Sequence, residues 1–479
     1  MSLTKLTAAG VARRIRDRDV SPVAVVDAHL DRIDERNDRT NAFVTVTAES
    51  ARERAREAER ALEEGREVGP LHGVPVAIKD LDDVAGVQTT SGSLLFADRV
   101  AETDSPYVAR LKAAGAIVVG KTNTPEFGLG TVTDNRVLGA TSTPFDTDRV
   151  SGGSSGGAAA ALADSLVPLA PGSDIGGSIR IPASLCGVYG LKPTYGLVPC
   201  VDRPDGFDSH TPFLHNGPIA RTVEDAALSL DVMAGVHPRD PFSVPARTNY
   251  RDAVSRSIDG MQIAYSPDMG LYPIEPDVRE TLDAAVSAFE RAGATVDRVD
   301  PTFDCDREDV LSAYYVMARA RWKTLFDRLE EQGFDPRGAD RDRLRPYLVD
   351  LVMNAEEPSR TEQRRASEVR TQVLDGLQDL FEQYDLLATA TLATTAFPHG
   401  SEPETIDGVG VERHRGWVLT QPYNFTGQPA ASIPAGFSDG LPVGMQIAGR
   451  RFADDDVLAA SAAFERRRPW RDRYPGNDR

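Results

Sequence analysis

The spacing of apolar residues predicts helices in the first part of the chain, residues 1–65. Ser21 followed by Pro22 is typical of a helix N-terminus, because the serine hydroxyl can accept a hydrogen bond from the first turn and proline fits the first helical position. Apolar residues then recur at helical spacing, at Val23, Val26, Leu30 and Ile33. Residues 48–64 are rich in Ala, Arg and Glu, which predicts an exposed helix.

Short apolar runs and helical segments alternate after this region. Residues 74–78 form a brief apolar run beside Gly73, which predicts a strand that ends at Lys79. A helical pattern at residues 107–114 precedes a second apolar run at 116–119. This alternation favours an α/β layer structure. Further along the chain, we expect charged helices over residues 300–385 and buried strands at 386–392 and 430–433.

Residues 120–200 are rich in Gly, Ser, Thr and Pro. Apolar blocks at 158–163 and 166–170 interrupt this composition, and a disordered linker would lack such blocks. The segment therefore predicts a folded core with several tight backbone turns. By contrast, residues 466–479 predict a loose C-terminal tail.

The chain carries 73 Asp and Glu against 54 Lys and Arg, which gives a net charge of −19. This balance argues against a protein that binds duplex DNA, because phosphate contacts need a basic surface. Few of the basic residues are lysines, namely Lys5, Lys79, Lys112, Lys121, Lys192 and Lys323. An acidic, lysine-poor composition suggests adaptation to high salt, and a GC-rich genome is the alternative explanation for the excess of arginine.

The cysteines and the N-terminus exclude several other classes. Cys186, Cys200 and Cys305 are too widely spaced for a metal clip and too few for a disulfide framework. Residues 1–20 lack the apolar core of a signal peptide, and no run of about 18 apolar residues predicts a membrane span. We therefore expect a cytoplasmic protein with no membrane partner.

Lys79 is the first residue that suggests chemistry. A lysine directly after a buried strand has a desolvated stem, and desolvation lowers the pKa of its ammonium group. A neutral lysine can act as a general base. The alternative is a lysine that reaches the surface or pairs with Asp80.

A glycine-rich run, residues 151–157, follows. It lacks the lysine of a phosphate-binding loop, so nucleotide binding is a weak interpretation. It contains the pattern G-x-S-x-G with Ser154 at its centre, but the elbow of an α/β-hydrolase follows a buried strand, and residues 146–150 are expected to be a polar loop. We therefore interpret that match as coincidental; a flexible linker is the remaining alternative.

Residues 172–180 contain the elements of an acyl-transfer site. Two adjacent glycines allow unusual backbone angles, so several N–H groups can converge on one point and form an oxyanion hole. The candidate donors are Ile175, Gly176, Gly177 and Ser178, and the last also offers a hydroxyl. An ordinary turn that enters a helix is the alternative.

In combination, these segments resemble the amidase signature family. The resemblance rests on residues 152–157, 172–180 and 191–196, on Lys79, and on the segments 427–434 and 441–446, so it covers nearly the whole chain. It implies one large α/β domain over residues 1–465, with a mixed, twisted β-sheet core and helices on both faces. Within it we expect N-terminal helices at 1–65, a signature core at about 70–200 and a variable, substrate-shaping helical region at about 300–385.

The resemblance also implies a Ser–Ser–Lys triad that needs no metal and no cofactor. Ser178 is then the nucleophile, Ser154, on a cis peptide bond, relays the proton, and Lys79 is the base. Further residues carry over from the family: Ser155 as a hydrogen-bonding neighbour, Asp174 and Arg180 as braces of the glycine-rich turn, and Gly128 as a position that touches substrate. None of the histidines is required, and His210 and His215 are expected to lie in loops.

Two functions share this signature. One is an amidohydrolase that acts alone on a small-molecule amide; the other is the glutaminase subunit of a tRNA-dependent amidotransferase. The subunit typically has an Asp where Trp417 stands, and a tyrosine-rich stretch where residues 356–369 have Arg and Glu. We therefore expect the hydrolase, with no nucleic-acid partner and with a homodimer left open.

Three aromatic residues are candidates for the substrate pocket. Trp417 is expected to suit an aliphatic or aromatic acyl group, whereas core packing is the favoured interpretation for Tyr314 and Trp322. The identity of the acyl group stays open, among urea-type, nitrile-derived, aryl and lactam-like amides.

Overall fold

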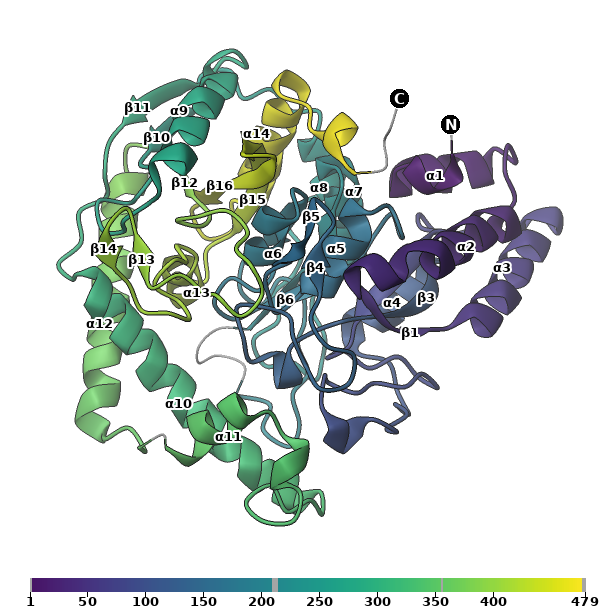
Figure 1. The fold of residues 1–479 in the computed structure, drawn as a ribbon. Helices are drawn as coiled ribbons and strands as arrows, with labels where there is room; N and C mark the ends of the chain where they lie inside the picture. The colour runs from purple at the N-terminus through teal and green to yellow at the C-terminus, as the bar shows by residue number, and fades with distance from the viewer. Residues whose placement is uncertain (1, 209–213, 355, 476–479) are drawn as a thin grey trace.

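A long mixed β-sheet runs through the computed structural model, which describes residues 2–208, 214–354 and 356–475 (Figure 1). Seven of its strands lie in the order β11-β10-β12-β16-β15-β7-β9, and three more in the order β1-β3-β2. Leu169 joins the two parts, because it bridges to Val76 of β2 and to Ala220 of β9. The pairs β10/β11, β10/β12 and β2/β3 are parallel and the other pairs are antiparallel. The strand bounds are β1 Phe43–Val46, β2 Pro75–Lys79, β3 Ile117–Thr122, β7 Tyr189–Lys192, β9 Ile219–Ala220, β10 Gln262–Tyr265, β11 Thr295–Arg298, β12 Leu386–Ala390, β15 Ala430–Ser438 and β16 Leu441–Gly449.

Helices cover both faces of this sheet. A Cβ on Gly444 of β16 would meet Ser184 of α6, whereas one on Gly436 of β15 would meet Thr281 of α9, so α6 and α9 pack on opposite sides. Near the N-terminus, α2 packs on α3, and α3 packs on β3. The helix bounds are α1 Ala8–Arg16, α2 Pro22–Thr40, α3 Ala48–Glu63, α4 Pro106–Ala113, α5 Gly156–Ala163, α6 Arg180–Leu185, α7 Val223–Met233, α8 Tyr250–Ala253, α9 Pro276–Glu290, α13 Gln421–Thr426 and α14 Asp454–Arg467. The α/β fold with a mixed sheet is confirmed.

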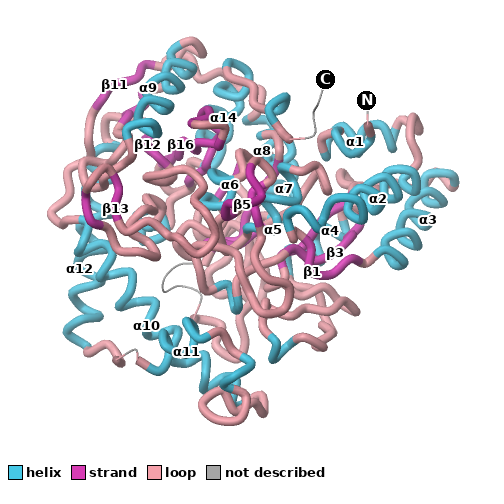
Figure 2. Tube along the Cα trace, viewed as in Figure 1, coloured by secondary structure: helices cyan, strands magenta, loops and turns pink. Residues whose placement is uncertain are grey.

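The helical region expected at residues 300–385 stands apart from the sheet, at the lower left of Figure 1. It consists of α10 (Arg307–Glu331), α11 (Pro346–Met353) and α12 (Arg360–Phe381). Capping boxes start the two long helices, with Asp306 and Asp309 at α10 and Ser359 and Glu362 at α12. Figure 2 shows these helices beside long loops. Within the described residues, no helix combines the length and the apolar character needed to cross a membrane.

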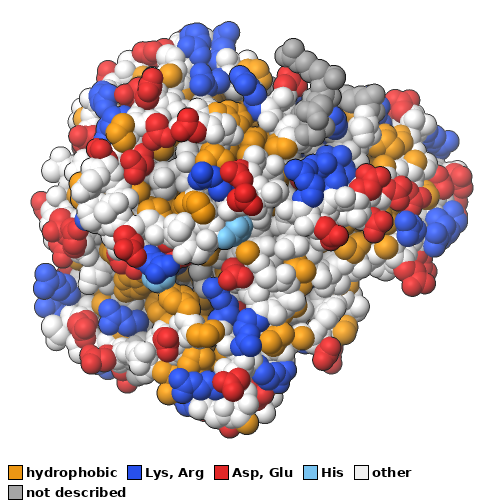
Figure 3. Space-filling model, viewed as in Figure 1, with side chains coloured by type: hydrophobic (Ala, Val, Ile, Leu, Met, Phe, Trp, Pro, Cys, Tyr) orange, Lys and Arg blue, Asp and Glu red, His pale blue; other side chains and the backbone are white. Residues whose placement is uncertain are grey.

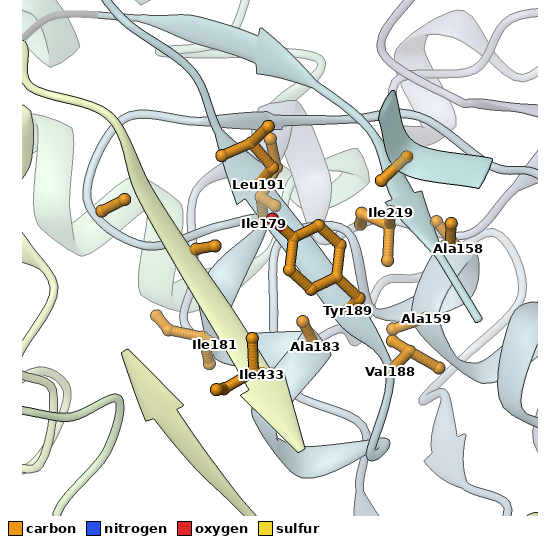
Figure 4. Close-up of a cluster of buried hydrophobic side chains, with 14 of the residues drawn as sticks. Ala158, Ala159, Ile179, Ile181, Ala183, Val188, Tyr189, Leu191, Ile219 and Ile433 are labelled. Carbon is orange, nitrogen blue, oxygen red and sulfur yellow. The ribbon is translucent and has the colours of Figure 1, made fainter. Parts of the chain in front are cut away.

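Residues 150–199 are almost entirely buried and form a large part of the core (Figure 4). Every residue of α5 is buried, and α5 approaches its neighbours so closely that a Cβ on Gly157 would lie 2.3 Å from the backbone nitrogen of Asn123. Figure 4 shows Tyr189 and Leu191 of β7 packed with Ile219 and Ile433. The expectation of a folded core with tight turns is therefore confirmed, and this core holds the loops on which the candidate site is built.

Local patterns place most elements well. Ser21 caps α2, since its side chain accepts a hydrogen bond from the backbone N–H of Ala24, and the apolar run at 74–78 lies in the fully buried β2. The region 1–65 also contains β1, which the helical interpretation missed because this strand has only four residues.

The C-terminus differs from the expected loose tail. α14 continues to Arg467, and beyond it Trp470 and Tyr474 are buried. The indole N–H of Trp470 donates to the backbone oxygen of Arg221. The two buried aromatic side chains hold residues 470–475 against the rest of the fold. The arginines around them in the sequence are typical of an exposed segment, which is why this burial was not expected.

Candidate active site

Lys79 is the last residue of β2 and its side chain is completely buried. The ammonium nitrogen Nζ donates to Oγ of Ser154 at 2.7 Å and to Oγ of Ser173 at 3.0 Å. Asp80 does not neutralise it; that carboxylate lies 3.3 Å from Nζ of Lys121 and accepts from Thr90. Both alternatives, a lysine that reaches the surface and a lysine that pairs with Asp80, are therefore wrong.

Burial lowers the pKa of Lys79 to about 7, and the carboxylates of Asp82 and Asp174 partly oppose this shift. Removing an ammonium group from water disfavours its charged form. At neutral pH a large fraction of Lys79 is consequently uncharged, which is the state in which an amine can accept a proton.

Ser154 lies in the loop between β5 (Asp146–Val150) and α5. The peptide bond between Gly153 and Ser154 is cis, and Gly152 has a φ of 78°. A Cβ on Gly153 would lie 2.8 Å from a backbone carbon of Val132, so the loop needs a glycine there.

The segment before this loop corrects one expectation. Residues 146–150 are not a loop; they form β5, which pairs with β4 (Ser142–Thr143) in an isolated two-stranded sheet. Because β5 is largely accessible, Ser154 does not follow the buried strand that a nucleophile elbow requires.

Ser178 follows β6 (Gly172–Asp174), which pairs with β8 (His215–Gly217). The Asp174 carboxylate accepts from the backbone N–H of Gly177 at 2.7 Å and of Ile179 at 3.2 Å. It also accepts from Nε and Nη2 of Arg180, both at 3.0 Å. Asp174 and Arg180 thus hold the glycine-rich turn in one shape.

This ion pair is fully buried. Burial alone would raise the pKa of Asp174, but the charge of Arg180 and hydrogen bonds from Arg180 and Asn424 outweigh burial and hold this pKa below its ordinary value. The carboxylate is therefore ionised at neutral pH.

The hydrogen bond from Gly177 corrects the expected set of oxyanion donors. Its N–H points to Asp174 and is not available to a substrate oxygen. Gly177 has a φ of 118°, and a Cβ there would lie 2.2 Å from the Thr420 hydroxyl oxygen, so its role is to shape the turn. The N–H groups of Ile175, Gly176 and Ser178 remain as candidates.

Ser155 connects the two serine loops. Its backbone N–H donates to the backbone oxygen of Ser178 at 3.2 Å, and its hydroxyl donates to the backbone oxygen of Ser173 at 3.4 Å. The loop that carries Ser154 and the turn that carries Ser178 are therefore directly hydrogen-bonded to each other.

A cavity of about 1500 Å³ opens over these loops. Its wall includes both Ser154 and half-buried Ser178. Gly128 also lines it, with a φ of 72°, and a Cβ there would lie 3.7 Å from Oγ of Ser154. The position expected to touch substrate thus lies next to one of the two serines.

The aromatic residues that line the cavity are not the ones expected to do so. Tyr314 and Trp322, both from α10, line the cavity, whereas Trp417 does not. Trp417 is fully buried, with its ring edge-on to Phe397 at 5.0 Å and its indole N–H donating to the backbone oxygen of Arg413. Aromatic residues on a long helix suit either a core or a pocket, and the sequence does not distinguish the two.

Sequence reasoning missed Arg415, which also lines the cavity. It lies in a segment rich in charged residues, 411–415, so its pattern is typical of a solvent-exposed loop. Only the three-dimensional structure shows that this segment lies beside the glycine-rich turn.

Two histidines, His210 and His215, were expected to lie in loops. His215 lies on strand β8 rather than in a loop, and its ring contacts the backbone oxygen of Asp174 at 3.3 Å. Burial and the nearby charge of Lys192 lower its pKa, while His210 lies outside the described residues. In the part of the chain that the structure describes, no three His, Cys, Asp or Glu side chains are grouped to hold a metal.

Comparisons with known proteins identify the family. The family model described as Amidase matches residues 24–458, so the chain belongs to the amidase family. An acylamidase from Rhodococcus erythropolis is 38% identical over 98% of this chain and 97% of that protein. The crystal structure of a bacterial aryl acylamidase of the amidase signature family superposes with a TM-score of 0.94, at 35% identity over 98% of this chain and 97% of the other.

One subunit of glutamyl-tRNA(Gln) amidotransferase is also similar. The protein from Chloroflexus aurantiacus is 36% identical over 99% of each chain. The structure of the corresponding protein from Thermotoga maritima superposes with a TM-score of 0.76, at 30% identity over 98% of this chain and 96% of the other. The chain resembles the acylamidases more in both sequence and shape, and it is a hydrolase that acts on amide C–N bonds.

Proposed function

We propose that this enzyme hydrolyses an amide of a small carboxylic acid through an acyl-enzyme on Ser178. The observation that carries the proposal is the buried hydrogen bond of 2.7 Å between Lys79 and Ser154, beside the cavity that Ser178 enters. A serine hydroxyl is a weak nucleophile until a base takes its proton. A neutral Lys79 supplies that base through one intermediate hydroxyl.

The proton path follows from this arrangement. As Oγ of Ser178 attacks the amide carbon, its proton passes to Oγ of Ser154, and the Ser154 proton passes to Nζ of Lys79. The same path then returns a proton to the leaving nitrogen, which departs as ammonia or an amine. Water next attacks the ester on Ser178, gives its proton to the same chain, and releases the acid.

Backbone N–H groups stabilise the negative oxygen that forms during attack. We assign this role to Ile175, Gly176 and Ser178, because Asp174 occupies the N–H of Gly177. The Asp174–Arg180 pair acts indirectly, since it fixes the turn that aims these donors. Donors fixed in advance cost no reorganisation when charge develops.

A hydrolase that acts alone is favoured over the glutaminase subunit. Trp417 stands where that subunit typically has an Asp, and its burial against Phe397 leaves no carboxylate there to bind the amino group of glutamine. The stronger likeness to acylamidases points to acyl amides of ammonia or aromatic amines as substrates. Such a substrate is a small molecule.

The test is a substrate panel on the isolated chain. It contains butyramide, acetanilide, 4-nitroacetanilide and glutamine, with release of ammonia or of the amine as readout. We expect hydrolysis of at least one simple amide or anilide without any partner and no preference for glutamine. Hydrolysis of glutamine alone would contradict the hydrolase assignment.

The pKa of Lys79 predicts the pH dependence. If neutral Lys79 is the base, kcat/KM rises with pH through about 7 and reaches a plateau above it. Asp82 raises the pKa of Lys79, so Asp82→Asn is expected to lower that pKa and move the rising limb toward acid. The check is a kcat/KM profile from pH 5 to 9, at constant ionic strength.

Asp83→Asn is the matched control for this profile, because the Asp83 carboxylate pairs with Arg99 at 2.6 Å and does not act on Lys79. The control should retain the wild-type midpoint. A midpoint that stays in place in Asp82→Asn, or that moves toward alkali, would contradict the assignment of Lys79 as the titrating base.

The net charge of −19 supports a further proposal, that the protein is adapted to high salt. Figure 3 shows Asp and Glu side chains spread among Arg and Lys over the visible face. Like charges destabilise a compact chain, and salt screens them. We expect the unfolding temperature to rise between 0.1 and 2 M potassium chloride; an unchanged or lower value would count against adaptation to salt.

A further inference from the structure

The Arg415 guanidinium lies against the glycine-rich turn. A Cβ on Gly176 would be 2.8 Å from Nη1 of Arg415 and 2.9 Å from the Tyr314 hydroxyl. The guanidinium carbon also stands 4.2 Å from the centre of the Tyr314 ring. Since Gly176 is two residues before Ser178, this positive charge lies next to the position of the reacting amide.

Arg415 lines the cavity without a paired carboxylate. Several other arginines of the cavity wall have acidic partners: Arg99 has Asp83, Arg328 has Asp208, and Arg413 has Glu402. Arg110 and Arg203 instead donate to backbone oxygens. Among the described residues, no carboxylate oxygen lies within 4.0 Å of the Arg415 guanidinium, and its buried Nη1 has no hydrogen-bond acceptor. A buried donor without an acceptor is costly unless a ligand supplies one.

The segment around Arg415 is held in place from both sides. The Glu412 carboxylate accepts from the backbone N–H of Arg415 at 2.7 Å and of His414 at 3.1 Å. The Thr131 hydroxyl donates to the backbone oxygen of His414 at 2.8 Å. The backbone at Arg415 is therefore a fixed part of the cavity wall, and the guanidinium lies over the Tyr314 ring.

The chemistry of the guanidinium defines the group it would bind. A planar fork of N–H donors matches the two oxygens of a carboxylate, and such charged hydrogen bonds are stronger than neutral ones. The cavity of about 1500 Å³ has room for a substrate with a second functional group.

We propose that Arg415 is a specificity-determining residue that binds a carboxylate of the substrate, so that the enzyme prefers amides that carry a carboxylate near the scissile bond. This inference rests on the proposed amide hydrolysis and names its substrate class. Arg415 would act in binding, and the proton path from Ser178 to Lys79 would not depend on it.

Matched pairs of amides test the proposal. Succinamate against pentanamide places the carboxylate on the acyl side, and 4-acetamidobenzoate against 4-nitroacetanilide places it on the amine side. The ratio of kcat/KM for the charged and the neutral member is measured in wild type, Arg415→Met, Arg415→Lys and Arg364→Met. The last variant is the control, because Arg364 lies outside the cavity and pairs with Glu368 on the surface of α12.

We expect Arg415→Met to lower that ratio by about 10- to 100-fold for at least one pair, mainly through KM of the charged substrate. Arg415→Lys should retain part of the ratio, and Arg364→Met should leave it unchanged. An equal loss for both members of each pair would overturn the proposal and indicate a structural or oxyanion role.

Suppose that Arg415→Met folds, still hydrolyses the neutral amides and has the wild-type ratio of kcat/KM. That result would overturn the inference, and the proposed function would stand. If wild type hydrolysed no member of either pair, the inference would fall; the proposed function would fall with it only if the substrate panel also gave no hydrolysis. If Arg415→Met did not fold, the ratio in Arg415→Lys would decide: a reduced ratio would support the carboxylate contact through the lost fork, and a wild-type ratio would overturn it.

Discussion

Replacing Ser178 by alanine is expected to lower kcat for every amide substrate by at least about 10⁴-fold, because it removes the hydroxyl that attacks the amide carbon. Lys79→Met should cost nearly as much, since the members of such a triad act as a unit. The methionine side chain is unbranched like that of lysine, one heavy atom shorter, and cannot accept a proton. The measurement is the steady-state rate on the best amide of the panel, with folding checked by a thermal melt.

Lys112→Met is the matched control for these variants. It also removes a lysine, but one that pairs with Asp104 at 2.7 Å and is partly exposed, so activity should stay near that of the wild type. Near-normal turnover of Lys79→Met at neutral pH would contradict the base assignment. Retained turnover in Ser178→Ala would contradict the nucleophile assignment.

Arg180→Met is expected to destabilise the protein by about 3–5 kcal/mol, because it leaves the fully buried Asp174 carboxylate without its cation. It also removes donors from three further acceptors, the oxygens of Thr420, Gln446 and Asn424. The readout is the free energy of unfolding in urea at neutral pH. Activity should fall with it, because the same residues hold the turn before Ser178.

An exposed arginine provides the comparison. Arg364 pairs with Glu368 on the surface of α12, and Arg364→Met should cost less than about 1 kcal/mol. If both variants lost the same stability, or if Arg180→Met were as stable as the wild type, the buried pair would not have the structural role assigned to it.

The elements of the fold were predictable where local patterns are strong. The apolar run before Lys79 and the helix behind Ser21-Pro22 appear where expected. The short β1 and the buried C-terminal Trp470 were missed, because their order depends on partners far away in the sequence. Strand pairing and long-range anchoring leave little trace in composition.

The site was predictable in a similar, partial way. The family resemblance pointed to Lys79 and Ser154, and the fold holds them within hydrogen-bonding distance. It could not tell that the N–H of Gly177 is used by Asp174, since that depends on the direction of one backbone group. Nor could it separate Tyr314, which faces the cavity, from Trp417, which packs in the core.

The central claim is that the acyl group is transferred to Ser178, and mass spectrometry after acid quenching tests it most directly. A nitrophenyl ester of the preferred acyl group is activated, so it would acylate the enzyme faster than water hydrolyses the acyl-enzyme. The account predicts the acyl mass on the peptide that contains Ser178, and its absence in Ser178→Ala. An acyl group on Ser154 or Lys79, or a fully active enzyme that is never acylated, would contradict it.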